Sequence, residues 1–140
     1  MNTNVKQVVP FLWVTDIERS VKFYTEGLNF EMINKWVDKD KLRWCWLQWG
    51  GAAIMLQEYL PERIPQIKRG EGVSVCFQCT DAVAIYHDAL SKNIVASEPE
   101  VGNSMWVTLI IDPDGYKLDF ESHTEVPEET KLSEWKRIAR

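Results

Sequence analysis

The chain has 140 residues, of which 16 are basic and 21 acidic, so its formal net charge at pH 7 is −5. This length is typical of one domain and is too short for two independent globular units. The acidic balance, without any run of Lys or Arg longer than two, argues against nucleic acid and anionic membrane as partners.

No stretch approaches the roughly 18 consecutive apolar residues of a membrane span. The start, MNTNVKQVV, lacks the charged and then apolar layout of a signal peptide. We therefore expect a cytoplasmic protein.

The first half of the chain predicts a strand, a helix and three further strands. VVPFLWVTD is an extended apolar run that ends at Thr15 and Asp16, both favourable helix N-caps. IERSVKFYTEGL then has apolar residues at helical spacing. FEMINKWV, LRWCWLQWG and AAIMLQEY have strand character. We assign this βαβββ module to about residues 5–58.

The second half repeats this order. LPERIPQIKRGEG contains two prolines and two glycines without a clear period, which predicts a linker over residues 59–70. GVSVCFQCTD again ends in a Thr–Asp pair, at an offset of 65 residues from the first. A helical pattern and the strand-like segments IVASEPEV, SMWVTLIID and YKLDFES follow. This second module spans about residues 71–123.

The tail, residues 124–140, has acids early, bases late, and Leu132, Trp135 and Ile138 at a spacing of three. This pattern predicts a short amphipathic helix. Because one βαβββ module can hardly close a core alone, the two should form a single domain over residues 1–140. The predicted fold class is α+β.

Three cysteines do not suggest a disulfide framework. Cys76 and Cys79 form a CxxC, but inside a β-rich run, where the two side chains would point to opposite faces about 10 Å apart. We interpret them as packing cysteines.

The paired modules, the segment VTDIERSVKFYTEGLNFE and the closing DPDGYKLDFES resemble the vicinal oxygen chelate superfamily, which includes glyoxalases, bleomycin resistance proteins and extradiol dioxygenases. The likeness runs from Val8 to Ser122. It implies two tandem modules that form a curved mixed sheet around a cavity, often completed across a homodimer.

Catalytic members of that superfamily bind a divalent metal through His and Glu side chains, one from each of four strands. By the resemblance, these positions fall on Val9, Met55, Ser74 and Asp119. One carboxylate with such companions cannot hold the ion. We therefore expect no metal and no other cofactor.

The two histidines do not restore a site. His87 falls in the second helix and His123 just past the last strand. A shifted site of Asp119, Glu121 and His123 remains open, but residues two apart on a strand lie about 6.6 Å apart at Cα, too far without donors from other strands.

Alternation from the family positions predicts the cavity-facing side chains. Those that we assign to ligand binding are Phe11, Trp13, Met55, Gln57, Ser74, Gln78, Asp119 and Glu121. This mixture is typical of a small-molecule pocket, whereas the alternative is a sheet face open to solvent. The bulk of Phe11, Trp13 and Met55 favours the pocket.

The chain has seven tryptophans. Judged by number alone, core and interface packing is the simpler explanation, and an aromatic pocket is the other. In LRWCWLQWG, alternation does not decide which side chains face the cavity: either Trp44 and Trp46 or Cys45 and Trp49 face inward. We include Trp44, Trp46 and Trp106 among the ligand-binding candidates.

The leading functional hypothesis is a bleomycin-resistance-like homodimer that sequesters a small molecule, planar or cationic, without altering it. The alternative is a lyase, isomerase or dioxygenase with a displaced metal site, or with Asp119 or Glu121 as acid or base. A third is a ligand sensor, or a subunit whose cavity serves no chemistry. No residue can be assigned a catalytic role.

Overall fold

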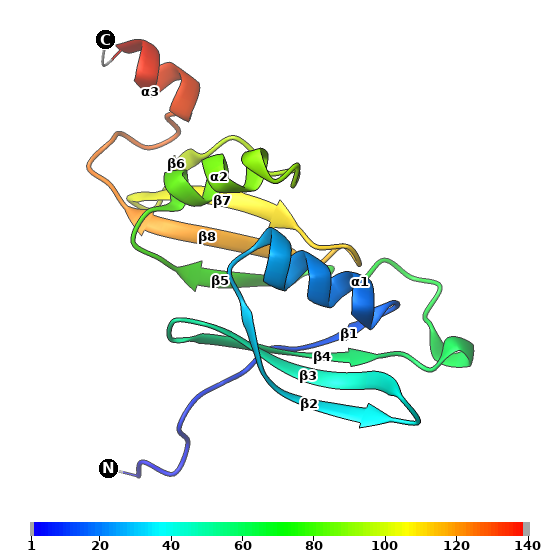
Figure 1. Cartoon of the computed structure of the whole chain (residues 1–140). Coiled ribbons are helices and arrows are strands. Elements are labelled where there is room, and N and C mark those ends of the chain that lie inside the picture. The colour runs from blue at the N-terminus through cyan, green and yellow to red at the C-terminus, as the bar shows by residue number, and fades with distance from the viewer. Residues whose placement is uncertain (1, 139–140) are drawn as a thin grey trace. The chain divides into compact units, whose positions relative to one another are not determined.

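The computed structural model describes residues 2–138 and divides into two compact units, unit 1 (Met1–Gln66) and unit 2 (Ile67–Arg140). The predicted fold class is confirmed: the protein is α+β, with two four-stranded mixed sheets from βαβββ-like modules and a C-terminal helix (Figure 1).

Unit 1 contains one βαβββ module and a short 3-10 turn. Its elements are β1 (Phe11–Val14), α1 (Ile17–Lys22), the π-helical turn η1 (Phe23–Gly27), β2 (Glu31–Asp38), β3 (Lys41–Trp49), β4 (Ala52–Glu58) and η2 (Pro61–Arg63). The strand order is β1-β4-β3-β2, in which β1 pairs with β4 in parallel and the other pairs are antiparallel.

Unit 2 repeats this topology and adds a tail. Its elements are β5 (Ser74–Gln78), α2 (Ala82–Ser91), β6 (Glu100–Gly102), β7 (Met105–Ile111), β8 (Lys117–His123) and α3 (Leu132–Ile138). The order β5-β8-β7-β6 matches that of unit 1 position by position. The strand expected over IVASEPEV is reduced to the three residues of β6 and a single bridge from Ala96 to Ile110.

Each main helix begins in the same way. The side chain of Asp16 accepts a hydrogen bond from the Arg19 N–H at 3.1 Å, and that of Asp81 accepts one from the Ala84 N–H at 2.9 Å. These N-caps satisfy N–H groups that the helix itself leaves without a partner. They explain why the Thr–Asp pairs in the sequence mark both helix starts.

The core of each unit lies between one sheet face and its helix. In unit 1, α1 packs against β3 and β4, and Val14, Ile54 and Leu56 are fully buried. In unit 2, α2 packs against β7 and β8, where Ile110 and Leu118 are fully buried. The opposite face of each sheet is therefore free of the helix and available for other contacts.

The C-terminal tail docks on unit 2. Backbone bonds join Leu132 to Pro99 and Val101 to Thr130, and Leu132 packs with Ala82, Val101 and Trp106. The side chain of Ile138, expected on the same stripe, lies outside the described residues. No helix within residues 2–138 is long and apolar enough to cross a membrane.

Candidate functional site

The helix-free face of the unit 1 sheet carries a row of large side chains. In register, Trp13 lies opposite Gln57, Gln57 opposite Trp44, and Trp44 opposite Trp36, so the row crosses all four strands. Residues that pair directly across strands point to the same face. Trp44 therefore shares a face with Trp13, and this resolves the open phase of β3.

A second row runs beside the first. Phe11 lies opposite Met55, and Met55 opposite Trp46. Phe11 and Trp13 are 45% and 41% exposed, which is high for aromatic side chains. The ring centroids of Phe11 and Trp13 lie 5.7 Å apart, and those of Trp13 and Tyr59 lie 5.5 Å apart. A contiguous exposed aromatic surface of this kind is a candidate binding surface.

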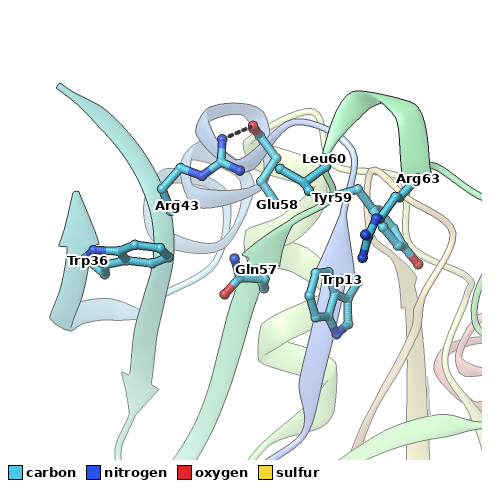
Figure 2. A pocket seen from close by; sticks show the side chains of 8 residues that line it. All are labelled: Trp13, Trp36, Arg43, Gln57, Glu58, Tyr59, Leu60 and Arg63. Atoms are coloured by element: carbon cyan, nitrogen blue, oxygen red, sulfur yellow. Dashed lines mark ion pairs between the residues drawn. The ribbon is translucent and has the colours of Figure 1, made fainter. Parts of the chain in front are cut away.

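A pocket of about 530 Å³ opens where β1 and β4 end on this face. Figure 2 shows Gln57 on its floor between Trp36 on one side and Trp13 on the other. Its lining residues are Trp13, Trp36, Arg43, Gln57, Glu58, Tyr59, Leu60 and Arg63. The volume falls within the range of about 300–1,000 Å³ that is typical of small-molecule sites.

Glu58 is the single acid among the lining residues, and its side chain is engaged by several donors. It is 7% exposed and accepts a hydrogen bond from the Ile17 N–H at 3.0 Å through Oε2. Its Oε1 lies 3.0 Å from Lys41 Nζ and 3.8 Å from Arg43 Nη1. Glu58 thus fastens β4 to the start of α1 and to β3.

The free face of the unit 2 sheet is polar along β5 and β8, where that of unit 1 is aromatic, and β7 adds the apolar Val107, Leu109 and Ile111 to it. The register places Ser74, Cys76 and Gln78 opposite Lys117, Asp119 and Glu121. Gln78 Nε2 donates to Glu121 Oε2 at 2.9 Å. Desolvation raises the pKa of Asp119, an effect that a hydrogen bond from Ser74 opposes and the charge of Glu121 strengthens.

Residues 5–120 match the family described as Glyoxalase/Bleomycin resistance protein/Dioxygenase superfamily. The chain belongs to this superfamily. The match covers most of both units and includes β1 through most of β8. No curated protein sequence matches the chain at a significant level.

Several solved structures share the superfamily fold with this chain at low sequence identity. TnmS3, an antibiotic-binding protein from Streptomyces sp. CB03234, is 17% identical with a TM-score of 0.68, covering 88% of this chain and 100% of its own. TioX from Micromonospora sp. ML1 is 17% identical with a TM-score of 0.67, covering 85% and 99%. A bleomycin-binding protein complexed with bleomycin is 21% identical with a TM-score of 0.65, covering 85% and 99%.

The residues that the sequence resemblance assigns to the superfamily's metal positions do not fit a divalent cation. Val9 and Met55 carry no nitrogen or oxygen donor, and Ser74 is a hydrogen-bond partner of Asp119. Within residues 2–138, no group of three or more His, Cys, Asp and Glu side chains is placed to hold a metal ion. In particular, His123 of the shifted alternative contacts Glu125 at 3.0 Å and is exposed.

One predicted ligand residue, Trp106, does not lie on the free face of its sheet. Trp106 pairs with Ser122 and Val101, is 8% exposed, and packs in the core with Leu132. It therefore lies on the covered face of its sheet, opposite to Asp119 and Glu121. Packing against α2 and Leu132 decides which face of the sheet Trp106 occupies. The sequence of β7 alone does not show this, because β7 has apolar residues on both faces.

The cysteines also differ from expectation in one respect. All three are free thiols. Cys45 is fully buried and burial raises its pKa to about 11, as expected for a packing cysteine. Cys76, however, is exposed on the polar face, so its interpretation as a packing residue is wrong. Burial raises the pKa of Cys79 as well.

Most of the pocket wall was not anticipated from the sequence. Trp36, Arg43 and Glu58 had no assigned role, and Tyr59 to Arg63 fell in the expected linker. The place of Trp36 depends on two irregularities in the pairing of β2 with β3, which strand alternation does not reveal. The proximity of an aromatic and an arginine in YLPERIP was the one local signal.

Proposed function

We propose that this protein binds a small planar molecule on the aromatic face of unit 1 and sequesters it without altering it. The main observation behind the proposal is the row Trp13–Gln57–Trp44–Trp36, of which Trp13, Gln57 and Trp36 line a pocket of about 530 Å³. Indole rings offer flat apolar surface, and the amide of Gln57 offers a donor and an acceptor to orient a guest. This function resembles that of a bleomycin resistance protein.

The comparisons support the proposal at the level of the fold. One structural neighbour is described as an antibiotic-binding protein and another is a bleomycin-binding protein in complex with its drug. From the superfamily resemblance we also propose a homodimer that acts in the cytoplasm. Light scattering on the purified chain measures the first of these properties, and a mass of one chain would contradict it.

Tryptophan fluorescence tests the binding function. Titration with bleomycin and with a panel of planar aromatic compounds should give saturable quenching for at least one compound. Mass spectrometry after release should recover that compound unchanged. Absence of saturable quenching across the whole panel would contradict the proposal.

A second candidate, an enzyme of the superfamily, rests on Asp119. Because desolvation raises the pKa of this carboxyl, it holds a proton at higher pH than an ordinary aspartate and is suited to acid or base chemistry. Conversion of a bound compound by the wild type but not by Asp119→Asn would favour this candidate. Equal recovery of unchanged compound from both would contradict it.

A further inference from the structure

The pocket of unit 1 has an excess of positive charge. Two arginines, Arg43 and Arg63, line it, and among its lining residues only Glu58 is acidic. The lining also includes Gln57 and four apolar or aromatic side chains that carry no charge. The formal charge of the wall is therefore positive, whereas the chain as a whole is at −5.

Glu58 has little negative charge to offer a ligand. Its Oε2 accepts the Ile17 N–H, and its Oε1 faces the ammonium of Lys41 and the guanidinium of Arg43. Figure 2 shows the Arg43–Glu58 pair on the upper wall, above Gln57. With both oxygens occupied, a cationic ligand would have to compete with two existing cations for this carboxylate.

Arg63 is the base that remains available. It is exposed, it ends η2, and within residues 2–138 no ion pair to its guanidinium is formed. Figure 2 shows its side chain on the same side of the pocket as Tyr59, across from Trp36. Its neighbour Glu62 is also exposed but does not line the pocket. A guanidinium fork suits the planar, bidentate recognition of a carboxylate.

We infer that the pocket selects a planar aromatic ligand that carries an anionic group such as a carboxylate, with its ring against Trp13 and Trp36 and its charge at Arg63. This inference rests on the proposed function and adds the charge of the ligand. It differs from the cationic ligand that the sequence analysis included among its expectations.

The net charge of the whole chain does not reverse this preference. At physiological ionic strength, charges more than about 8 Å apart are largely screened. The local pair of ligand and Arg63 therefore decides the affinity, and the distant acids mainly slow the approach of an anion. Added salt should weaken binding of the anion and leave a neutral analogue unaffected.

Three probes with one ring system isolate the charge: 2-naphthoate, 2-naphthylmethanol and protonated 2-naphthylmethylamine. Calorimetry on the wild type should rank the affinities anion, neutral, cation, with the anion about twofold to fivefold tighter than the neutral probe, as expected for one partly exposed ion pair. Arg63→Gln should remove this advantage and leave the neutral probe unchanged. Arg63→Lys should restore part of it.

Arg19→Gln is the matched control, because it removes the same charge from an exposed position on α1, on the helix-covered side of the sheet. It should bind all three probes like the wild type. Equal affinity for the probes, tightest binding of the amine, or an undiminished anion preference in Arg63→Gln would overturn the charge inference while leaving the proposed function intact. Failure of all three probes to bind the wild type would overturn the charge inference, and it would overturn the proposed function as well if no compound of the fluorescence panel bound.

Discussion

Unit 1 and unit 2 share a backbone plan but have different free faces. Each has the strand order first-fourth-third-second, and each begins its main helix with an aspartate N-cap. A side chain near the end of the last strand of each module also accepts a hydrogen bond from the first N–H of that helix: Glu58 from Ile17 and Ser122 from Ala82. Equivalent positions in the two units thus supply an acceptor for the first helical N–H, but with different side chains.

The shared topology does not determine which residues occupy the free sheet faces. Where unit 1 pairs Phe11 with Met55, unit 2 pairs Cys76 with Asp119. Next along the strands, Trp13 with Gln57 in unit 1 corresponds to Gln78 with Glu121 in unit 2. The covered faces are apolar in both units because they pack under a helix, so they fix the register. The free faces can diverge, and their chemistry carries the function.

The largest expected effect is a loss of folding stability, and it should be greater for the alanine variant of Glu58 than for that of Ser122. Glu58→Ala leaves the buried Ile17 N–H without its acceptor and removes the partner of Lys41 and Arg43, so it should lower the free energy of unfolding by about 2–4 kcal/mol. Ser122→Ala likewise leaves the buried Ala82 N–H without its acceptor but breaks no ion pair, so it should cost less, about 1–2 kcal/mol. Urea unfolding measures both. An equal or larger loss for Ser122→Ala would contradict this ranking.

The next effect concerns ligand binding on the two free faces. Trp13→Ala removes a stacking surface of the unit 1 pocket and should weaken a planar ligand about tenfold, or ~1.4 kcal/mol. Gln78→Ala, at the equivalent position of unit 2, should leave the affinity unchanged. Calorimetry with one planar compound compares them. If Gln78→Ala weakened binding as much as Trp13→Ala, the assignment of binding to unit 1 would be wrong.

The two N-caps should be equal. Asp16→Ala and Asp81→Ala each remove one side-chain hydrogen bond at a helix start and should each cost about 1 kcal/mol. Chemical denaturation of the two variants tests whether the two caps contribute equally to the free energy of unfolding. A difference of more than about 1 kcal/mol between them would show that the caps are not equivalent.

The smallest effect is a pH dependence specific to unit 2. Because desolvation raises the pKa of Asp119, the stability it contributes is fully present below the unfolded pKa of about 3.9 and is lost as pH rises through the raised folded value. Relative to the wild type, Asp119→Asn should therefore gain stability from pH 3.5 to pH 7. Unfolding curves across this range test the sign, and a flat or falling difference would contradict it.

The sequence was sufficient for the topology because its signals are local. The Thr–Asp pairs before Ile17 and Ala82, followed by helical spacing, mark the start of each helix. Strand alternation also placed Phe11, Met55 and Gln57 on one face. The site was less predictable because it depends on pairing between distant strands, as with Trp36, and on helix packing, as with Trp106.

Two-dimensional NMR of the ¹⁵N-labelled chain tests most directly whether unit 1 carries the binding face. Saturating 2-naphthoate should shift the indole N–H signals of Trp13 and Trp36, which line the pocket, and leave that of Trp106, in the core of unit 2, in place. Saturable shifts confined to the backbone of β5 and β8, around Asp119 and Glu121, would contradict the assignment of binding to unit 1.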